Sequence, residues 1–412
     1  MSSNPPEDTN PTKPIPVIDS HIHLFPASHL DTLAWHTPSN PLGSQHSVAQ
    51  YCEATRAISK DPNTTDEFYL KGFVFIEADR KSSLDPKDWD HALDEVSFAA
   101  RIASGNPVPG EGHEPADRDL CLAIIPWAPV PAGPEVLKAY MDKVRERMGS
   151  DELFKKVKGV RYLLQDKPPR TMLDDKFVQG VKWLGEQGLL FELGIDARQG
   201  GLWQLHEAVK LLEKVYEGGR TVPKVVISTY ILHPNLDQIS SYTYPRTNPE
   251  LDHMCKPNLH LMRCDSSELK EYPDYAMWFK YIEALARFPA TYMKISGLFA
   301  EMEQLPSSES EEEEAKLISS VGLKLLLWVT DILTKFTPHR MMFGSDWPVC
   351  NVGGIGQPTW LRWLKIVKWV SEDWGDSSLL EEIMGRVAGR VYGCRTSPEP
   401  YRCDSDICPF SD

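Results

Sequence analysis

The sequence of 412 residues predicts an α/β fold, a (β/α)8 TIM barrel. Short apolar runs alternate with amphipathic stretches of helical length, a pattern typical of parallel βα units with right-handed crossovers. Eight such runs occur, and several end in residues that can do chemistry, as expected at the carboxyl ends of barrel strands. An open doubly wound sheet is the alternative fold, but no glycine-rich phosphate turn follows the first run.

The predicted strands are short runs rich in Val, Ile, Leu, Phe and Met, which favour buried strands when turn residues bound them. In chain order they are Val17–Asp19, Gly72–Glu77, Leu120–Pro126, Val157–Leu163, Leu189–Leu193, Val225–Ser228, Thr291–Ser296 and Met341–Phe343. Between or after them lie stretches with a helical repeat of apolar residues. The predicted helices are Trp89–Ile102, Glu135–Met148, Lys176–Gln187, Leu202–Tyr216, Thr359–Glu372 and Leu379–Tyr392.

We predict one barrel domain over residues 15–394. Residues 1–14 are rich in Pro, Asn, Ser and Thr without an apolar core, so they are expected to form a disordered leader. Residues 395–412 are expected to form a loose tail. The acidic run Glu309–Glu314 indicates a solvated loop or the start of a helix.

Composition excludes some classes of partner. A net charge of −15, from 44 basic and 59 acidic residues, argues against a nucleic-acid or anionic membrane surface. The apolar run Leu323–Val329 is too short to cross a bilayer and indicates a buried helix face. The eight cysteines lack metal-type spacing and no secretory signal precedes them, so we expect a reduced cytoplasmic protein. The oligomeric state stays open.

Two histidines and an aspartate are the strongest functional signal. His21 and His23 stand at the end of the first predicted strand, and Asp346 follows the last one. Side chains alternate along a strand, so the His-x-His spacing directs both imidazoles to one side. Such a pair suits a metal ion, or a transition state that needs donors and a proton carrier.

Five motifs in order carry a family resemblance: Val17–His23, Phe75–Arg80, Gly159–Tyr162, Met293–Gly297 and Phe343–Pro348. With them the chain resembles the amidohydrolase superfamily, specifically its amidohydrolase-2, lactonase-like branch. The resemblance implies a barrel like that of metal-dependent hydrolases. Members of this branch hydrolyse sugar lactones or the lactone of a pyrone dicarboxylate, and sister branches decarboxylate aromatic acids with a divalent metal.

The family places a histidine after the sixth strand, within a His-x-x-Lys-Pro segment. Here that segment appears only at Leu251–Asn258, and residues 229–250 separate it from the strand. We therefore interpret 229–250 as an insertion, either a retained intron or a natural loop over the site. His253 is the expected histidine, and His233 is the reserve.

The resemblance implies catalytic roles for five residues. Asp346, ionised at neutral pH, is the expected base for water. His21, His23 and His253 are expected to donate to the carbonyl oxygen, each donor contributing about 3 kcal/mol. Arg161 stays charged and can hold a developing oxyanion or substrate hydroxyls; a structural ion pair at a strand end is its alternative role.

Four further residues are predicted to contact substrate: Glu77, Lys256, Lys294 and Trp347. For Glu77 and Lys294, and for Glu192 at another strand end, a structural role is an equal alternative. Few basic residues accompany the motifs, which favours a neutral polyhydroxylated lactone over a dicarboxylate.

The expected cofactor is one divalent ion, Zn or Mn, held by His21, His23, His253 and Asp346. A binuclear site is not expected, because Val160–Leu164 contains no lysine that could become a bridging carbamate. Metal-free members also occur in the lactonase-like branch, and a metal-free mechanism is the alternative.

The predicted function is hydrolysis of the ester in a sugar-acid lactone, a small-molecule substrate. One alternative is a metal-dependent decarboxylase of an aromatic or unsaturated carboxylic acid. The other is an inactive homologue in which the insertion displaces His253 from the site.

Overall fold

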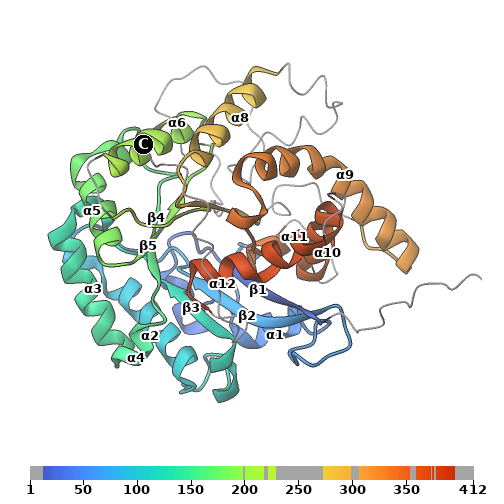
Figure 1. Ribbon diagram of the computed structural model, residues 1–412. Coiled ribbons are helices and arrows are strands. Elements are labelled where there is room, and N and C mark those ends of the chain that lie inside the picture. The colour runs from blue at the N-terminus through green and yellow to red at the C-terminus, as the bar shows by residue number, and fades with distance from the viewer. Residues whose placement is uncertain are drawn as a thin grey trace, which may run out of the picture.

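The structure, a computed structural model, describes residues 13–197, 200–217, 221–228, 272–297, 306–352, 359–372, 374 and 377–394. Within these ranges, strands gather at the centre and helices surround them (Figure 1). The proposed insertion 229–250, the residues His233, His253 and Lys256, and the tail 395–412 lie outside the described residues, as does most of the predicted leader.

All eight predicted strands are present, and each differs from its predicted bounds by a few residues at most. They are β1 Ile15–Ile22, β2 Phe68–Ile76, β3 Cys121–Ile125, β4 Gly159–Leu163, β5 Leu190–Gly194, β6 Val225–Ser228, β7 Thr291–Ile295 and β8 Met341–Phe343. Every pairing between neighbouring strands is parallel. The alternation of apolar runs and helices therefore predicted the strand set correctly.

The strands form two ladders, β1-β2-β3 and β4-β5-β6-β7-β8, which meet at two seams. Isolated parallel bridges join the first seam, between Ile124 and Val157 and between Trp127 and Arg161. At the second seam Ile22 bridges Trp347, and the His21 carbonyl accepts from the Asp346 amide at 2.9 Å. The ring of strands thus closes where β1 meets the segment after β8.

Helices cover the outside of this ring (Figure 1). Within the described ranges the α-helices are α1 Val48–Ala54, α2 Asp90–Ser104, α3 Pro134–Met148, α4 Asp151–Phe154, α5 Asp175–Glu186, α6 Trp203–Tyr216, α8 Pro273–Ala286, α9 Glu311–Phe336, α10 Thr359–Glu372, α11 Ser377–Glu381 and α12 Val387–Val391. A π-helical turn, η10 Glu382–Arg386, joins α11 to α12, so the predicted helix Leu379–Tyr392 falls in three consecutive pieces.

The acidic run Glu309–Glu314 is the start of α9, one of its two predicted interpretations. Ser310 caps this helix by accepting from the Glu313 amide at 3.2 Å. Four glutamates in the first turn suit the positive end of the helix dipole. By length and composition α9 could cross a membrane, but its buried residues pack within the fold, where α9 contacts α8 and α10.

The interior of the ring is apolar at its amino-terminal end. Inward residues of the strands, including Ile18, Val74 and Met342, pack against Val387 and Val391 of α12. The C-terminal helix thus plugs one end of the barrel, and the polar side chains described below occupy the other end.

Candidate active site

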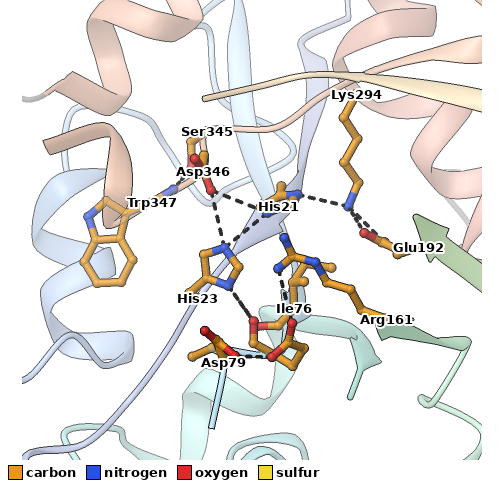
Figure 2. A network of polar contacts seen from close by, with 12 residues as sticks. His21, His23, Ile76, Asp79, Arg161, Glu192, Lys294, Ser345, Asp346 and Trp347 are labelled. Carbon is orange, nitrogen blue, oxygen red and sulfur yellow. Dashed lines mark hydrogen bonds and ion pairs between the residues drawn. The ribbon is translucent and has the colours of Figure 1, made fainter. Parts of the chain in front are cut away.

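Three side chains converge where β1 and β8 end (Figure 2). His21 is the second-last residue of β1, His23 follows it, and Asp346 lies three residues beyond β8. The two Nε2 atoms are 3.1 Å apart, and Asp346 Oδ1 lies 3.4 Å from His21 Nε2 and 3.3 Å from His23 Nε2. All three side chains are buried. The structure therefore brings together three of the predicted metal ligands.

Main-chain carbonyls orient His23. Its Nδ1 donates to the Glu77 carbonyl at 2.8 Å and also lies 3.2 Å from the Ile76 carbonyl. A carbonyl can only accept, so the proton of neutral His23 sits on Nδ1 and the Nε2 lone pair faces the site. In metal sites, a histidine that binds the ion through one ring nitrogen commonly donates from the other to a carbonyl, which fixes its orientation.

Lys294 orients His21. Lys294 Nζ lies 3.3 Å from His21 Nδ1 and 2.7 Å from Glu192 Oε2, with all these groups buried. Burial lowers the pKa of Lys294 to about 8, against the opposing effect of Glu192. An ammonium can only donate, so it places the proton of neutral His21 on Nε2, toward His23 and Asp346. Tyr392 donates to Glu192 Oε1 at 2.6 Å.

Arg161 and Glu77 form a second buried pair. Arg161 Nη1 lies 3.5 Å from Glu77 Oε1, and neither side chain is exposed. Glu77 Oε2 also accepts from the Asp79 amide at 2.6 Å. Glu77 therefore forms an ion pair with Arg161. A structural contact of this kind is what the alternative role of each residue predicts.

A carboxylate below the site supports the segment that carries Asp346. Asp19 accepts from the Ser345 amide at 2.8 Å and from the Ser345 hydroxyl at 2.6 Å. Tyr51 and Trp360 donate to the same carboxylate at 3.1 and 2.7 Å. Burial raises the pKa of Asp19, while the hydrogen bonds from Ser345 and Trp360 oppose that effect. We did not predict this network, although Asp19 lies in the first motif.

The backbone after β8 has two features that place Asp346 beside the histidines. Asp346 has a φ of 59°, a left-handed conformation that aspartate tolerates better than most residues. A Cβ at Gly344 would lie 2.9 Å from His21 Cβ, so only glycine lets β8 approach β1 this closely. The approach sets the distance between Asp346 and the two histidines.

Trp347, predicted to contact substrate, packs at the barrel rim. It is 1% exposed, and its ring meets His46 and Tyr51 edge to face at 5.5 Å. Its proposed contact with substrate remains a prediction.

A cavity of about 360 Å³ opens at the carboxyl ends of β1 to β4. Among the residues that line it are Trp35, Asp79, Trp127, Tyr162, Asp166 and Lys167. Asp79 comes two residues after Glu77, and Tyr162 follows Arg161. The contact between the Asp79 amide and Glu77 Oε2 therefore links the wall of the cavity to the Arg161–Glu77 pair.

Asp79 is an acid whose ionisation the fold opposes. Burial, with the charges of Glu77 and Asp166, raises the pKa of Asp79 from 3.8 to about 7, although Lys167 and Arg161 act in the opposite direction. The folded state therefore holds more protons than the unfolded state between these pH values, and the contribution of Asp79 to stability falls as pH rises.

Asp79→Asn is thus expected to gain stability relative to the wild type as pH is raised from 5 to 8, by on the order of 1–3 kcal/mol. Asparagine also tolerates the φ of 56° at this position. The measurement is urea unfolding of both proteins at each pH. A difference that stays constant across this range would contradict the assignment.

The convergent atoms fit a divalent ion. His21 Nε2, His23 Nε2 and Asp346 Oδ1 lie within 4.8 Å of one another, and two imidazoles with a carboxylate are a usual donor set for zinc. Ligand atoms about 2.1 Å from one ion stand roughly 3–3.5 Å apart, in line with the distances here. The buried carbonyl contact of His23 completes the pattern.

Comparison with known proteins agrees with the fold and the motifs. Residues 244–394 match the family model described as Amidohydrolase. The chain is 31% identical to an L-rhamnono-gamma-lactonase of Scheffersomyces stipitis over 85% of this chain and 90% of that protein. It is 26% identical to an L-fucono-1,5-lactonase of Burkholderia multivorans, over 60% and 64% of the two chains.

Among solved structures, an amidohydrolase from Burkholderia multivorans with bound zinc superposes with a TM-score of 0.59 at 19% identity. The match covers 92% of this chain and 99% of that one, which supports the barrel fold. With the motifs, the strand order and the lactonase similarity over most of its length, the chain belongs to the amidohydrolase family.

Proposed function

We propose that this protein hydrolyses the ester of a sugar-acid lactone. The observation that carries the proposal is the 31% identity, over 90% of its length, to a protein named L-rhamnono-gamma-lactonase. The convergence of His21, His23 and Asp346 supplies the groups that ester hydrolysis needs. The decarboxylase alternative has less support, since both curated relatives are lactonases.

In the proposed reaction, water attacks the lactone carbonyl and Asp346 accepts its proton. The Nε2–H of His21 donates to the carbonyl oxygen as charge develops there, and the buried charge of Arg161 stabilises the same change. The bond between the carbonyl carbon and the ring oxygen then breaks, and Asp346 returns the proton to that oxygen. The product is a hydroxy acid, which releases one proton at neutral pH.

We also propose that one divalent ion, Zn or Mn, binds to His21, His23 and Asp346, with His253 as a fourth ligand. Such an ion would polarise the carbonyl and lower the pKa of water. A metal ligand must present a lone pair, so binding would require the His21 proton to move from Nε2 to Nδ1 and Lys294 to lose a proton. Ion binding should therefore strengthen as pH rises. The donation from His21 Nε2–H described above belongs to the metal-free alternative, because an ion-bound Nε2 carries no proton. With an ion bound, the ion would polarise the carbonyl in place of that donor.

We propose that Glu77, Lys256, Lys294 and Trp347 contact the substrate. The inactive alternative depends on residues 229–250 and stays a prediction. We infer a reduced cytoplasmic setting, supported by the four cysteines of the described chain, Cys52, Cys121, Cys350 and Cys394, all of which are free. The net charge of −15 supports a small-molecule substrate over nucleic acid.

The test is proton release, followed with a pH indicator, when the purified full-length protein meets a panel of aldonolactones. The protein is assayed as purified, after a chelator, and after Zn or Mn is restored. We expect acid release above the spontaneous rate, lost with the chelator and regained with the ion. Chelator-resistant turnover would support the metal-free mechanism, and silence across the panel in all three states would overturn the proposed function.

A further inference from the structure

We propose that the cavity between Trp35, Asp79 and Tyr162 receives the hydroxylated side chain of the lactone, the part outside the ester ring. Within it, Asp79 is the specificity-determining residue that hydrogen-bonds a side-chain hydroxyl. This inference rests on the proposed lactonase function and adds the subsite that reads the substrate.

One residue, Glu77, contacts both His23 of the site and Asp79 of the cavity wall. The Glu77 carbonyl accepts from His23 Nδ1 at 2.8 Å, and the Glu77 carboxylate accepts from the Asp79 amide at 2.6 Å. Figure 2 shows Asp79 on the His23 side of the network. Asp79 therefore stands next to a residue that contacts His23, and the proposed subsite requires the lactone side chain to reach Asp79 from a carbonyl held near His21 and Asp346.

Size and walls suit a sugar. A volume of about 360 Å³ lies within the range of small-molecule sites, about 300–1,000 Å³. Trp127 and Tyr162, each 7% exposed, stand with ring centroids 6.5 Å apart, and Trp35 lines the cavity with them. Aromatic faces can pack on the C–H surface of a sugar while polar groups at the edge bind its hydroxyls.

The charges of the cavity favour hydroxyls over anions. Its two cations have carboxylate partners, because Arg80 pairs with Glu95 at 2.9 Å and Lys167 pairs with Asp166 at 2.8 Å. Asp79 lines the same space and is partly exposed there. A carboxyl group accepts strongly from a hydroxyl, whereas it repels a substrate carboxylate. The raised pKa of Asp79 lets its carboxyl donate as well as accept near neutral pH.

The backbone holds Asp79 in place for this role. Its φ of 56° is a left-handed conformation, and the contact of its amide with Glu77 Oε2 fixes it there. Trp35 Nε1 donates to the Ala78 carbonyl at 3.0 Å, which holds this aromatic residue of the wall against the same turn. The carboxyl group and an aromatic wall are thus positioned together before substrate enters.

The experiment compares two lactones on the full-length protein. One is L-rhamnono-γ-lactone, which carries a hydroxylated side chain. The other is a four-carbon aldono-1,4-lactone, which has ring hydroxyls and no side chain. We expect Asp79→Asn to lower the ratio of kcat/KM for the first lactone over the second by roughly tenfold or more, mainly through KM. Tyr162→Phe should lower the same ratio by less.

The control is Asp142→Asn, at an exposed position of α3 outside the cavity, which should leave the ratio as in the wild type. An equal loss of kcat/KM on both lactones in Asp79→Asn would mean that Asp79 only positions Glu77 and Arg161. That result would overturn the subsite. An unchanged ratio in Asp79→Asn and Tyr162→Phe would overturn it as well. Silence of the wild type across the whole aldonolactone panel would overturn the proposed function itself. A wild type that is active on the panel but opens neither of these two lactones would overturn the subsite alone.

Discussion

Asp346→Asn is expected to reduce lactone hydrolysis by roughly 10²–10⁴-fold, with little change in the fold. The substitution removes the group that accepts the proton of water, and general bases contribute about this factor. Asparagine keeps the shape of the side chain and tolerates the φ of 59° at this position. The measurement is kcat/KM on the most active aldonolactone, with thermal unfolding of both proteins alongside.

The matched control is the same change at an exposed position, Asp142→Asn, which should retain wild-type activity. It shows whether removing a carboxylate charge anywhere on the protein lowers activity, or only removing the one at Asp346. Residual activity within tenfold of the wild type, in a folded Asp346→Asn protein, would mean that another group activates water.

Lys294→Met should destabilise the protein by about 3–5 kcal/mol. The change leaves the Glu192 carboxylate buried without the ammonium that lies 2.7 Å from it, and breaking a buried pair in this way costs about that much. Urea unfolding measures the loss. Hydrolysis should fall too, because His21 Nδ1 loses the donor that sets its tautomer.

The double variant Lys294→Met with Glu192→Gln separates the two effects. A neutral amide at 192 removes the charge that the single variant leaves without a partner, and it can still accept from Tyr392, so we expect more than half of the lost stability to return. Activity should stay low, since nothing restores the donor to His21. A single variant that loses less than about 1 kcal/mol would show that the pair contributes little to stability.

Local patterns predicted the fold well, because strands and helices differ in the period of their apolar residues. The His-x-His spacing likewise anticipated that His21 and His23 would face the same point, since side chains alternate along a strand. The acidic run before α9 fits either a solvated loop or a helix start, because charged residues are common in both. The predicted helices do not include α1, α4 or α8, although the buried residues Tyr275, Trp278, Ile282 and Leu285 of α8 follow a helical spacing.

Contacts between distant segments were harder to anticipate. Asp19 and Ser345 are 326 residues apart in the sequence, and Trp360 comes from yet another element. Nothing local in any of these residues specifies the others as partners. The same holds for Tyr392, which reaches Glu192 only because α12 plugs the barrel. Such pairings depend on the closed ring, which a local pattern cannot describe.

The pairing of β1 with the segment after β8 affects how the protein folds into its active form. His21 and His23 are synthesised before Asp346, so the triad cannot assemble until the chain through β8 has left the ribosome. Pairings this far apart in sequence are slow to form, and until then β1 has one edge open to other chains. Catalysis would therefore report completed folding more strictly than helix content does. The open edge of β1 is the place where a chaperone or an aggregating chain would compete with the segment after β8.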